Sequence, residues 1–172
     1  MYQLKRTQFI HADLQTCWNY FSSPANLRVI TPNYVDFKVH TTVPENLYEG
    51  LIIRYTIRPI LGVPLSWISE IKTIREGDYF IDEQRRGPYG MWHHEHHFKE
   101  VEGGVEMTDL IAYCMPFGFI GRFFHWLFIR KQLESIFDYR FRKVEELFNA
   151  NDYVESALSE SLAPKIARTR KY

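Results

Sequence analysis

The sequence has few cysteines and no excess of charge of either sign. Only two of its 172 residues are cysteine, Cys17 and Cys114, and their spacing matches no zinc or redox motif. We therefore expect two free thiols, which favour a reducing, cytoplasmic location. Lysine plus arginine and aspartate plus glutamate each total 21, so the formal net charge at pH 7 is zero. A chain without a basic surplus is not expected to bind nucleic acid.

The sequence also lacks a hydrophobic run long enough to cross a membrane. Its most apolar segment, 115–129, is shorter than the roughly 20 residues of a spanning helix, and Arg122 and His125 interrupt it. No apolar stretch follows the charged N-terminus, so we expect no secretory signal peptide. The length suits one domain, which we place at residues 1–149. Residues 150–172 are expected to form a solvated or locally helical tail.

Aromatic residues, by contrast, are abundant. They make up 16% of the chain, with 13 Phe, 11 Tyr and 4 Trp. This is more than a core of this size ordinarily requires, and large rings commonly line ligand cavities.

The N-terminal residues predict one strand followed by two short helices. A strand is expected over 2–11, and Asp13 then stands in an N-cap position before apolar residues at helical spacing in 14–21. A second short helix is expected over 24–30, because a proline begins it and another proline follows it.

The middle of the chain alternates apolar and polar residues between regularly spaced turns. This pattern predicts six strands, at about 36–43, 50–58, 65–74, 79–86, 91–100 and 105–114. A loop with Pro116, Gly118 and Gly121 is expected next, followed by one amphipathic helix over 122–149. Without helices between the strands there can be no parallel crossovers. The fold class is therefore α+β, with a seven-stranded antiparallel sheet wrapped around the C-terminal helix.

Hairpin geometry predicts which strand residues face inward, because directly paired residues share a face of the sheet. One interior set combines Trp92, His94, His96 and Phe98 with Met107, Asp109, Ile111 and Tyr113. A second interior set combines Trp67, Ile71 and Thr73 with Phe80, Asp82 and Gln84. Burying so many polar groups in a dry core is costly, so the pattern favours a hydrated pocket.

Several segments resemble one protein family as a set. They are Phe80-Ile81-Asp82-Glu83-Gln84, Gly87-Pro88-Tyr89, the strand from Trp92 to Phe98, Tyr113 to Gly118, and parts of the helix from Arg130 to Arg140. Across residues 2–149 the chain resembles the START-like, helix-grip superfamily (SRPBCC), which includes the major birch pollen allergen and polyketide cyclases. The most similar branch is a bacterial group of small uncharacterised proteins, some of them labelled cell-division inhibitors. The resemblance implies a cavity between sheet and helix and ligand binding in general.

The leading interpretation is a non-enzymatic carrier or sensor of a small hydrophobic or lipid-like molecule. Trp67, Trp92 and Tyr113 are expected to supply apolar contacts, and Asp82, Gln84, His94 and His96 to bind the polar end of the ligand. No cofactor is expected.

Three other interpretations stay open at this point. His94 and His96 with Asp109 could hold a metal, but the run is not H-E-x-x-H, and hydrogen bonding is the preferred role. His96 and Asp109 could serve a cofactor-independent cyclase or dehydratase as base and orienting partner. The third alternative is a protein-interaction module.

The apolar residues around the start of the C-terminal helix form a further candidate site. Phe117, Phe119, Phe123 and Trp126 are more rings than one buried helical face can hold, and Arg122, Arg130 and Lys131 flank them. One interpretation is a helix gripped on several sides. The other is an apolar entrance to the cavity that makes transient contact with a membrane.

Overall fold

A single antiparallel sheet of seven strands forms the frame of the protein. The computed structural model describes residues 1–42, 44, 46–59 and 62–149. Strand order across the sheet is β1-β7-β6-β5-β4-β3-β2, and all neighbours are antiparallel. The strands are β1 (Tyr2–Ile10), β2 (Lys38–Val39), β3 (Ile52–Ile57), β4 (Leu65–Arg75), β5 (Tyr79–Arg86), β6 (Met91–Val101) and β7 (Gly104–Cys114). The predicted α+β class and sheet are confirmed.

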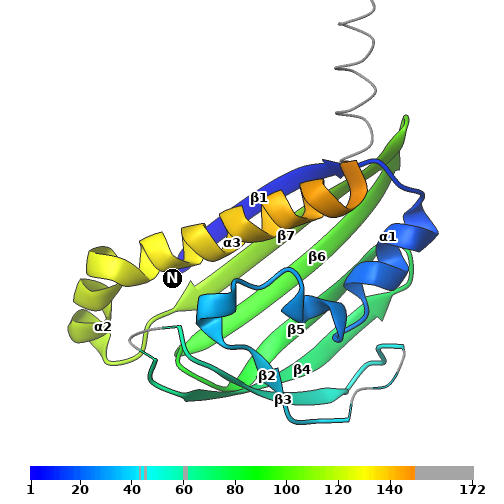
Figure 1. Ribbon diagram of the computed structural model, residues 1–172. Helices are drawn as coiled ribbons and strands as arrows, with labels where there is room; N and C mark the ends of the chain where they lie inside the picture. The colour runs from blue at the N-terminus through cyan, green and yellow to red at the C-terminus, as the bar shows by residue number, and fades with distance from the viewer. Residues whose placement is uncertain (43, 45, 60–61, 150–172) are drawn as a thin grey trace, which may run out of the picture.

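The helices lie on one face of this curved sheet (Figure 1). They are α1 (Leu14–Phe21), the 3₁₀ turns η1 (Asn26–Arg28) and η2 (Asn33–Val35), and a C-terminal helical segment made of α2 (Gly118–Phe124), a π-helical turn (His125–Ile129), α3 (Arg130–Val144) and a second π-helical turn (Glu145–Asn149). Asp13 caps α1 as predicted, because its side chain accepts a hydrogen bond from the Thr16 amide. Among the described residues, no helix combines the length and apolarity needed to span a bilayer.

Two of the predicted elements differ from the structure, and a third is not tested by it. The helix expected over 24–30 is only a 3₁₀ turn, and a second such turn follows it. The strand expected over 36–43 has two residues in the ladder, because Asp36 adopts a left-handed conformation with φ 44° and delays its start. The expected tail, 150–172, lies outside the described residues.

The C-terminal helix begins earlier than predicted, at Gly118 instead of residue 122. Gly121 lies inside α2, where a Cβ atom would collide with the carbonyl oxygen of Pro116. The glycine is therefore required for close contact between the helix and the preceding chain, not for a loop. Phe117 and Gly118 make the turn into α2 with φ values of 62° and 54°. A left-handed conformation is strained for a phenylalanine.

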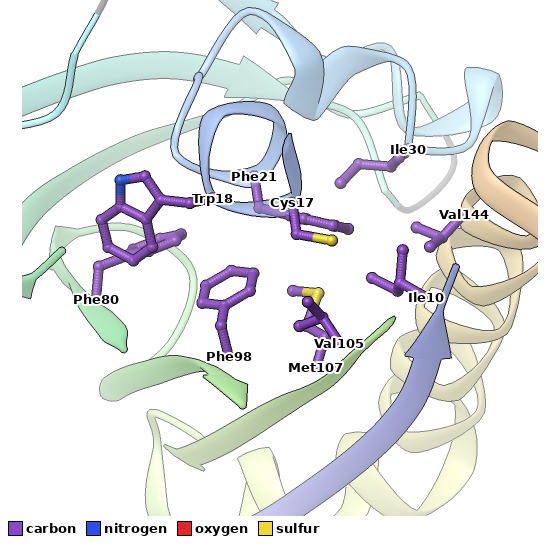
Figure 2. Close-up of a cluster of buried hydrophobic side chains, with 10 residues drawn as sticks. All are labelled: Ile10, Cys17, Trp18, Phe21, Ile30, Phe80, Phe98, Val105, Met107 and Val144. Carbon is purple, nitrogen blue, oxygen red and sulfur yellow. The ribbon is translucent and has the colours of Figure 1, made fainter. Parts of the chain in front are cut away.

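The buried apolar side chains separate into a solid core and two further clusters, the smallest of which is Leu51, Ile53 and Ile71. The solid core lies where α1 meets β6 and β7, and its buried members are Ile10, Cys17, Trp18, Phe21, Ile30, Phe80, Phe98, Val105, Met107 and Val144 (Figure 2). Both cysteines are free, and burial raises the pKa of the Cys17 thiol to about 11. The second cluster, around Trp67, Trp92 and Phe137, packs the other end of the sheet against α3.

The predicted register is confirmed for one hairpin and partly wrong for the other. Strands β6 and β7 pair Trp92 with Tyr113 and His96 with Asp109, so the predicted interior set shares one buried face. Strands β4 and β5 pair Ile71 with Asp82 but Thr73 with Ile81, because a bulge lies between Ile71 and Thr73. The bulge reverses the alternation, so Thr73 does not join the interior face.

Candidate functional site

A cavity of about 480 Å³ lies between the concave face of the sheet and α3. Most of its wall is apolar, with contributions from β3, β4, the 3₁₀ turns and the inward face of the C-terminal helix. Its apolar lining includes Leu27, Ile53, Ile57, Trp67, Ile71, Trp92, Leu133, Ile136 and Phe137. Its charged and imidazole side chains are Asp82, His94, His96 and Arg140. The cavity is therefore a mainly apolar space whose charged and imidazole groups are concentrated at one wall.

Two adjacent histidines between two carboxylates form the centre of that polar wall, with their ring planes tilted by 40°. The rings of His94 and His96 lie 3.8 Å apart, centroid to centroid. On one side, Asp82 Oδ2 lies 3.1 Å from His96 Nε2 and 3.5 Å from His94 Nδ1. On the other side, Asp109 Oδ1 lies 3.1 Å from His94 Nε2 and 2.9 Å from His96 Nδ1. The 2.9 Å contact is at ion-pair distance but is not aligned as a hydrogen bond.

Arg140 on α3 adds a buried positive charge behind this group. Its Nε atom lies 3.7 Å from Asp109 Oδ2, and its side chain is 10% exposed. Burial alone would raise the pKa of the Asp109 carboxyl, but Arg140 and the two histidines hold that pKa well below its usual value. Asp109 is therefore an anion whose charge is balanced by a fixed guanidinium.

The pKa values of the two histidines are shifted in opposite directions. Burial and the neighbouring His96 lower the pKa of His94. Burial also disfavours the charged form of His96, but contacts with Asp109 and Asp82 outweigh it and raise the pKa of His96. The pKa of Asp82 is lowered, because the histidines overcome the effect of its burial. If the cluster binds a proton, the proton belongs on His96.

One hydroxyl, that of Ser69, contacts Asp82 from the β3–β4 side, and two further side chains contact Ser69. The Ser69 hydroxyl donates to Asp82 Oδ1 at 3.5 Å, and it accepts a hydrogen bond of 3.0 Å from the Trp67 indole. The Tyr55 hydroxyl lies 3.1 Å from the same serine oxygen. This chain of contacts fixes the Asp82 carboxylate with Oδ2 toward the histidines.

The structure brings most of the predicted site residues together, but not all of them. Trp67, Asp82, Trp92, His94 and His96 line the cavity. Asp109 lies behind the histidines, outside the lining.

Two further predicted residues, Gln84 and Tyr113, do not line the cavity themselves. Gln84 binds the backbone of Tyr89 and so braces the turn between β5 and β6. The Tyr113 hydroxyl lies 2.8 Å from His125 Nε2 at the base of the C-terminal helix.

Arg140, Ser69 and Tyr55 were missed by the sequence interpretation. Arg140 follows Phe137 by three residues and precedes Val144 by four, so it lies on the apolar stripe of α3. An arginine in such a stripe is a detectable signal for a buried ion pair. Ser69 and Tyr55 carry no comparable signal, because a hydroxyl is common on either face of a strand.

An exposed aromatic surface adjoins the cavity. Phe117, Phe119, Phe123 and Trp126 are 80%, 73%, 55% and 74% exposed. Phe117 also lines the cavity, together with Ile120, Gly121 and Phe124 from α2. The patch, which we call the α2 patch, is therefore continuous with the cavity wall. Arg122, Arg130 and Lys131 are exposed beside it.

Comparisons with known proteins show the fold. No family model and no curated protein matched the chain. Protein Ms6760 from Mycobacterium smegmatis is 18% identical over 87% of this chain and 92% of its own, with a TM-score of 0.62. Protein CV1439 from Chromobacterium violaceum is 8% identical over 85% and 96%, with a TM-score of 0.65. A nucleoside-diphosphate sugar epimerase from Corynebacterium glutamicum, 19% identical, matches 83% of this chain with 28% of its own, at a TM-score of 0.60.

Proposed function

We propose that this protein is a carrier or sensor of the START-like, helix-grip superfamily that binds a small hydrophobic or lipid-like molecule. The observation that carries the proposal is the 480 Å³ cavity, which is apolar over most of its wall and polar at one place. Its volume falls within the range of small-molecule sites, about 300–1,000 Å³. Apolar contact with the wall would supply most of the affinity, and the polar wall would orient the ligand.

Binding is favoured over catalysis by the surroundings of His96. A general base needs a ring nitrogen directed at the substrate. In this site Nε2 faces Asp82 and Nδ1 faces Asp109, so both nitrogens of His96 are already directed at carboxylates. The arrangement supports a fixed polar anchor for a ligand more than a group that moves a proton on it.

Narrowing the cavity should weaken ligand binding. In Ile136→Trp the indole would occupy space within the lining, so we expect at least about tenfold weaker binding of a fluorescent fatty-acid probe. Thermal stability should change little, because the added ring enters a cavity and not a packed core. Fluorescence titration measures the affinity. Ser135→Trp is the matched control, since it adds the same ring at an exposed position. Equal probe affinity in Ile136→Trp and the wild type would contradict the proposal, as would a wild type that binds no apolar probe.

We further propose that the α2 patch docks on a lipid surface when the ligand enters or leaves. Exposed aromatic rings beside cations are typical of interfacial anchors, and the patch adjoins the cavity. Sedimentation with vesicles of phosphatidylcholine and anionic phosphatidylglycerol tests this. We expect Phe119→Ser/Trp126→Ala to lower the partition coefficient about tenfold or more. Tyr48→Ser, which alters another exposed ring, should leave it unchanged. Absence of vesicle binding by the wild type would overturn this docking proposal.

A further inference from the structure

We propose that Asp82, His94 and His96 bind one divalent transition-metal ion, with Zn²⁺ as the best match, at the polar wall of the cavity. Their ligand atoms all lie within 4.8 Å of one another. Two imidazoles and one carboxylate are a donor set that suits zinc. The site stands on these side chains alone and does not depend on the organic ligand proposed above.

The spacing of the ligand atoms fits tetrahedral coordination. Zinc–nitrogen and zinc–oxygen bonds of about 2.0–2.2 Å place neighbouring ligands of a tetrahedron roughly 3.3–3.6 Å apart. Asp82 Oδ2 lies 3.1 Å from His96 Nε2 and 3.5 Å from His94 Nδ1. Both distances from Asp82 to the imidazole nitrogens are therefore close to those of a tetrahedral site.

A second layer of contacts surrounds both imidazoles, with a hydrogen bond to Asp109 for His94 and a contact at ion-pair distance for His96. The nitrogens opposite the proposed ligand atoms, His94 Nε2 and His96 Nδ1, both face Asp109 Oδ1. Metal-binding histidines typically direct their other ring nitrogen at a carboxylate, which fixes the tautomer and strengthens the ligand. Arg140 holds Asp109, and Ser69 holds the second oxygen of Asp82. The supporting residues are thus already placed around the three ligands.

Charge balance also favours a cation here. Asp82 and Asp109 are two carboxylates in a buried group whose one permanent cation is Arg140. With neutral imidazoles the five side chains carry one net negative charge, which a bound cation would balance, as a proton on His96 would without metal. Asp82, His94 and His96 all line the cavity, so a fourth coordination position would open toward it. Three protein ligands with one open position are typical of zinc sites that contact a ligand or substrate.

The outer face of β6, the strand that carries His94 and His96, offers a comparison. His93 and His97 contact Glu83 and Glu95 there, and all four side chains are about 30% exposed or more. The residue types match the inner group, and an arginine is present in both: Arg85 lies 3.7 Å from Glu83 here, as Arg140 lies 3.7 Å from Asp109 inside. Substitutions on this face therefore serve as controls of equal composition.

Untagged, full-length protein treated with chelator and then titrated with Zn²⁺ tests the proposal. We expect one ion per chain by calorimetry, and a shift of the histidine side-chain nitrogen signals in the NMR spectrum for His94 Nδ1 and His96 Nε2. Asp82→Asn and His96→Ala should each weaken binding at least about 100-fold, and Asp109→Asn about 10- to 100-fold. His93→Ala/His97→Ala should bind as the wild type does.

The NMR measurement uses the wild type, so it decides the question even if a variant does not fold. Failure of the folded wild type to bind Zn²⁺ more tightly than about 100 µM would overturn the proposal. Loss of binding in His93→Ala/His97→Ala with retention in Asp82→Asn would also overturn it, by placing the ion on the outer face. Neither result would affect binding of the apolar probe, which tests the proposed function separately.

Discussion

Replacing Arg140 with methionine should lower the free energy of unfolding by about 3–5 kcal/mol at pH 7, because one partner of a buried ion pair is lost. The Asp109 side chain is 9% exposed and would remain in the protein without its guanidinium partner. Methionine keeps much of the length and apolar surface of arginine, but it loses the cation–π contacts of the guanidinium with the rings of Phe21 and Phe137. The loss should therefore be mainly electrostatic. Urea unfolding followed by circular dichroism measures it.

The pH dependence distinguishes this electrostatic loss from a packing defect. In the wild type the pKa of Asp109 is lowered, so its charged form adds stability above its unfolded pKa, which is lost as the pH falls through the folded value. Without Arg140 the pKa should rise, and the deficit of the variant should shrink as the pH approaches about 4, where the carboxyl takes up a proton.

Two further variants control this experiment. Arg140→Met/Asp109→Asn should recover part of the loss, because no uncompensated charge remains. Arg142→Met, an exposed arginine on the same helix, should change stability by less than about 0.5 kcal/mol. A pH-independent deficit in Arg140→Met of less than about 1 kcal/mol would contradict the assigned role of the ion pair.

The sequence predicts this fold best where local pattern and turn geometry agree. Strands β6 and β7 alternate without interruption and are joined by a tight turn, so the face that carries His94, His96 and Asp109 was predictable. The face of Thr73 was not, because one extra residue at a bulge reverses the alternation without a sequence signal. Gly121 was misleading for a similar reason, since close packing on Pro116 and a loop both require glycine.

The candidate site was predictable in composition but not in geometry. Alternation places Asp82, His94 and His96 on the interior face, and the structure brings them together. The sequence interpretation of a metal site paired the histidines with Asp109, whereas in the structure Asp82 faces the cavity and Asp109 supports the rings from behind. Which carboxylate lies on which side of an imidazole depends on side-chain rotamers and strand stagger, and neither is encoded in residue spacing.

The solid core and the cavity wall should respond differently to the same substitution. Phe98→Ala should cost about 3–5 kcal/mol, because it leaves a void in a packed cluster. Phe98 is 3% exposed, and its ring contacts those of Trp18, Phe21 and Phe80 (Figure 2). Phe128→Ala should cost only about 1–2 kcal/mol, because this half-buried ring borders the cavity and already lacks contacts on one side. Urea unfolding of the two variants measures the difference. Equal losses would mean that the cavity wall is packed as tightly as the core, and a protein packed in that way would have no room for the proposed ligand.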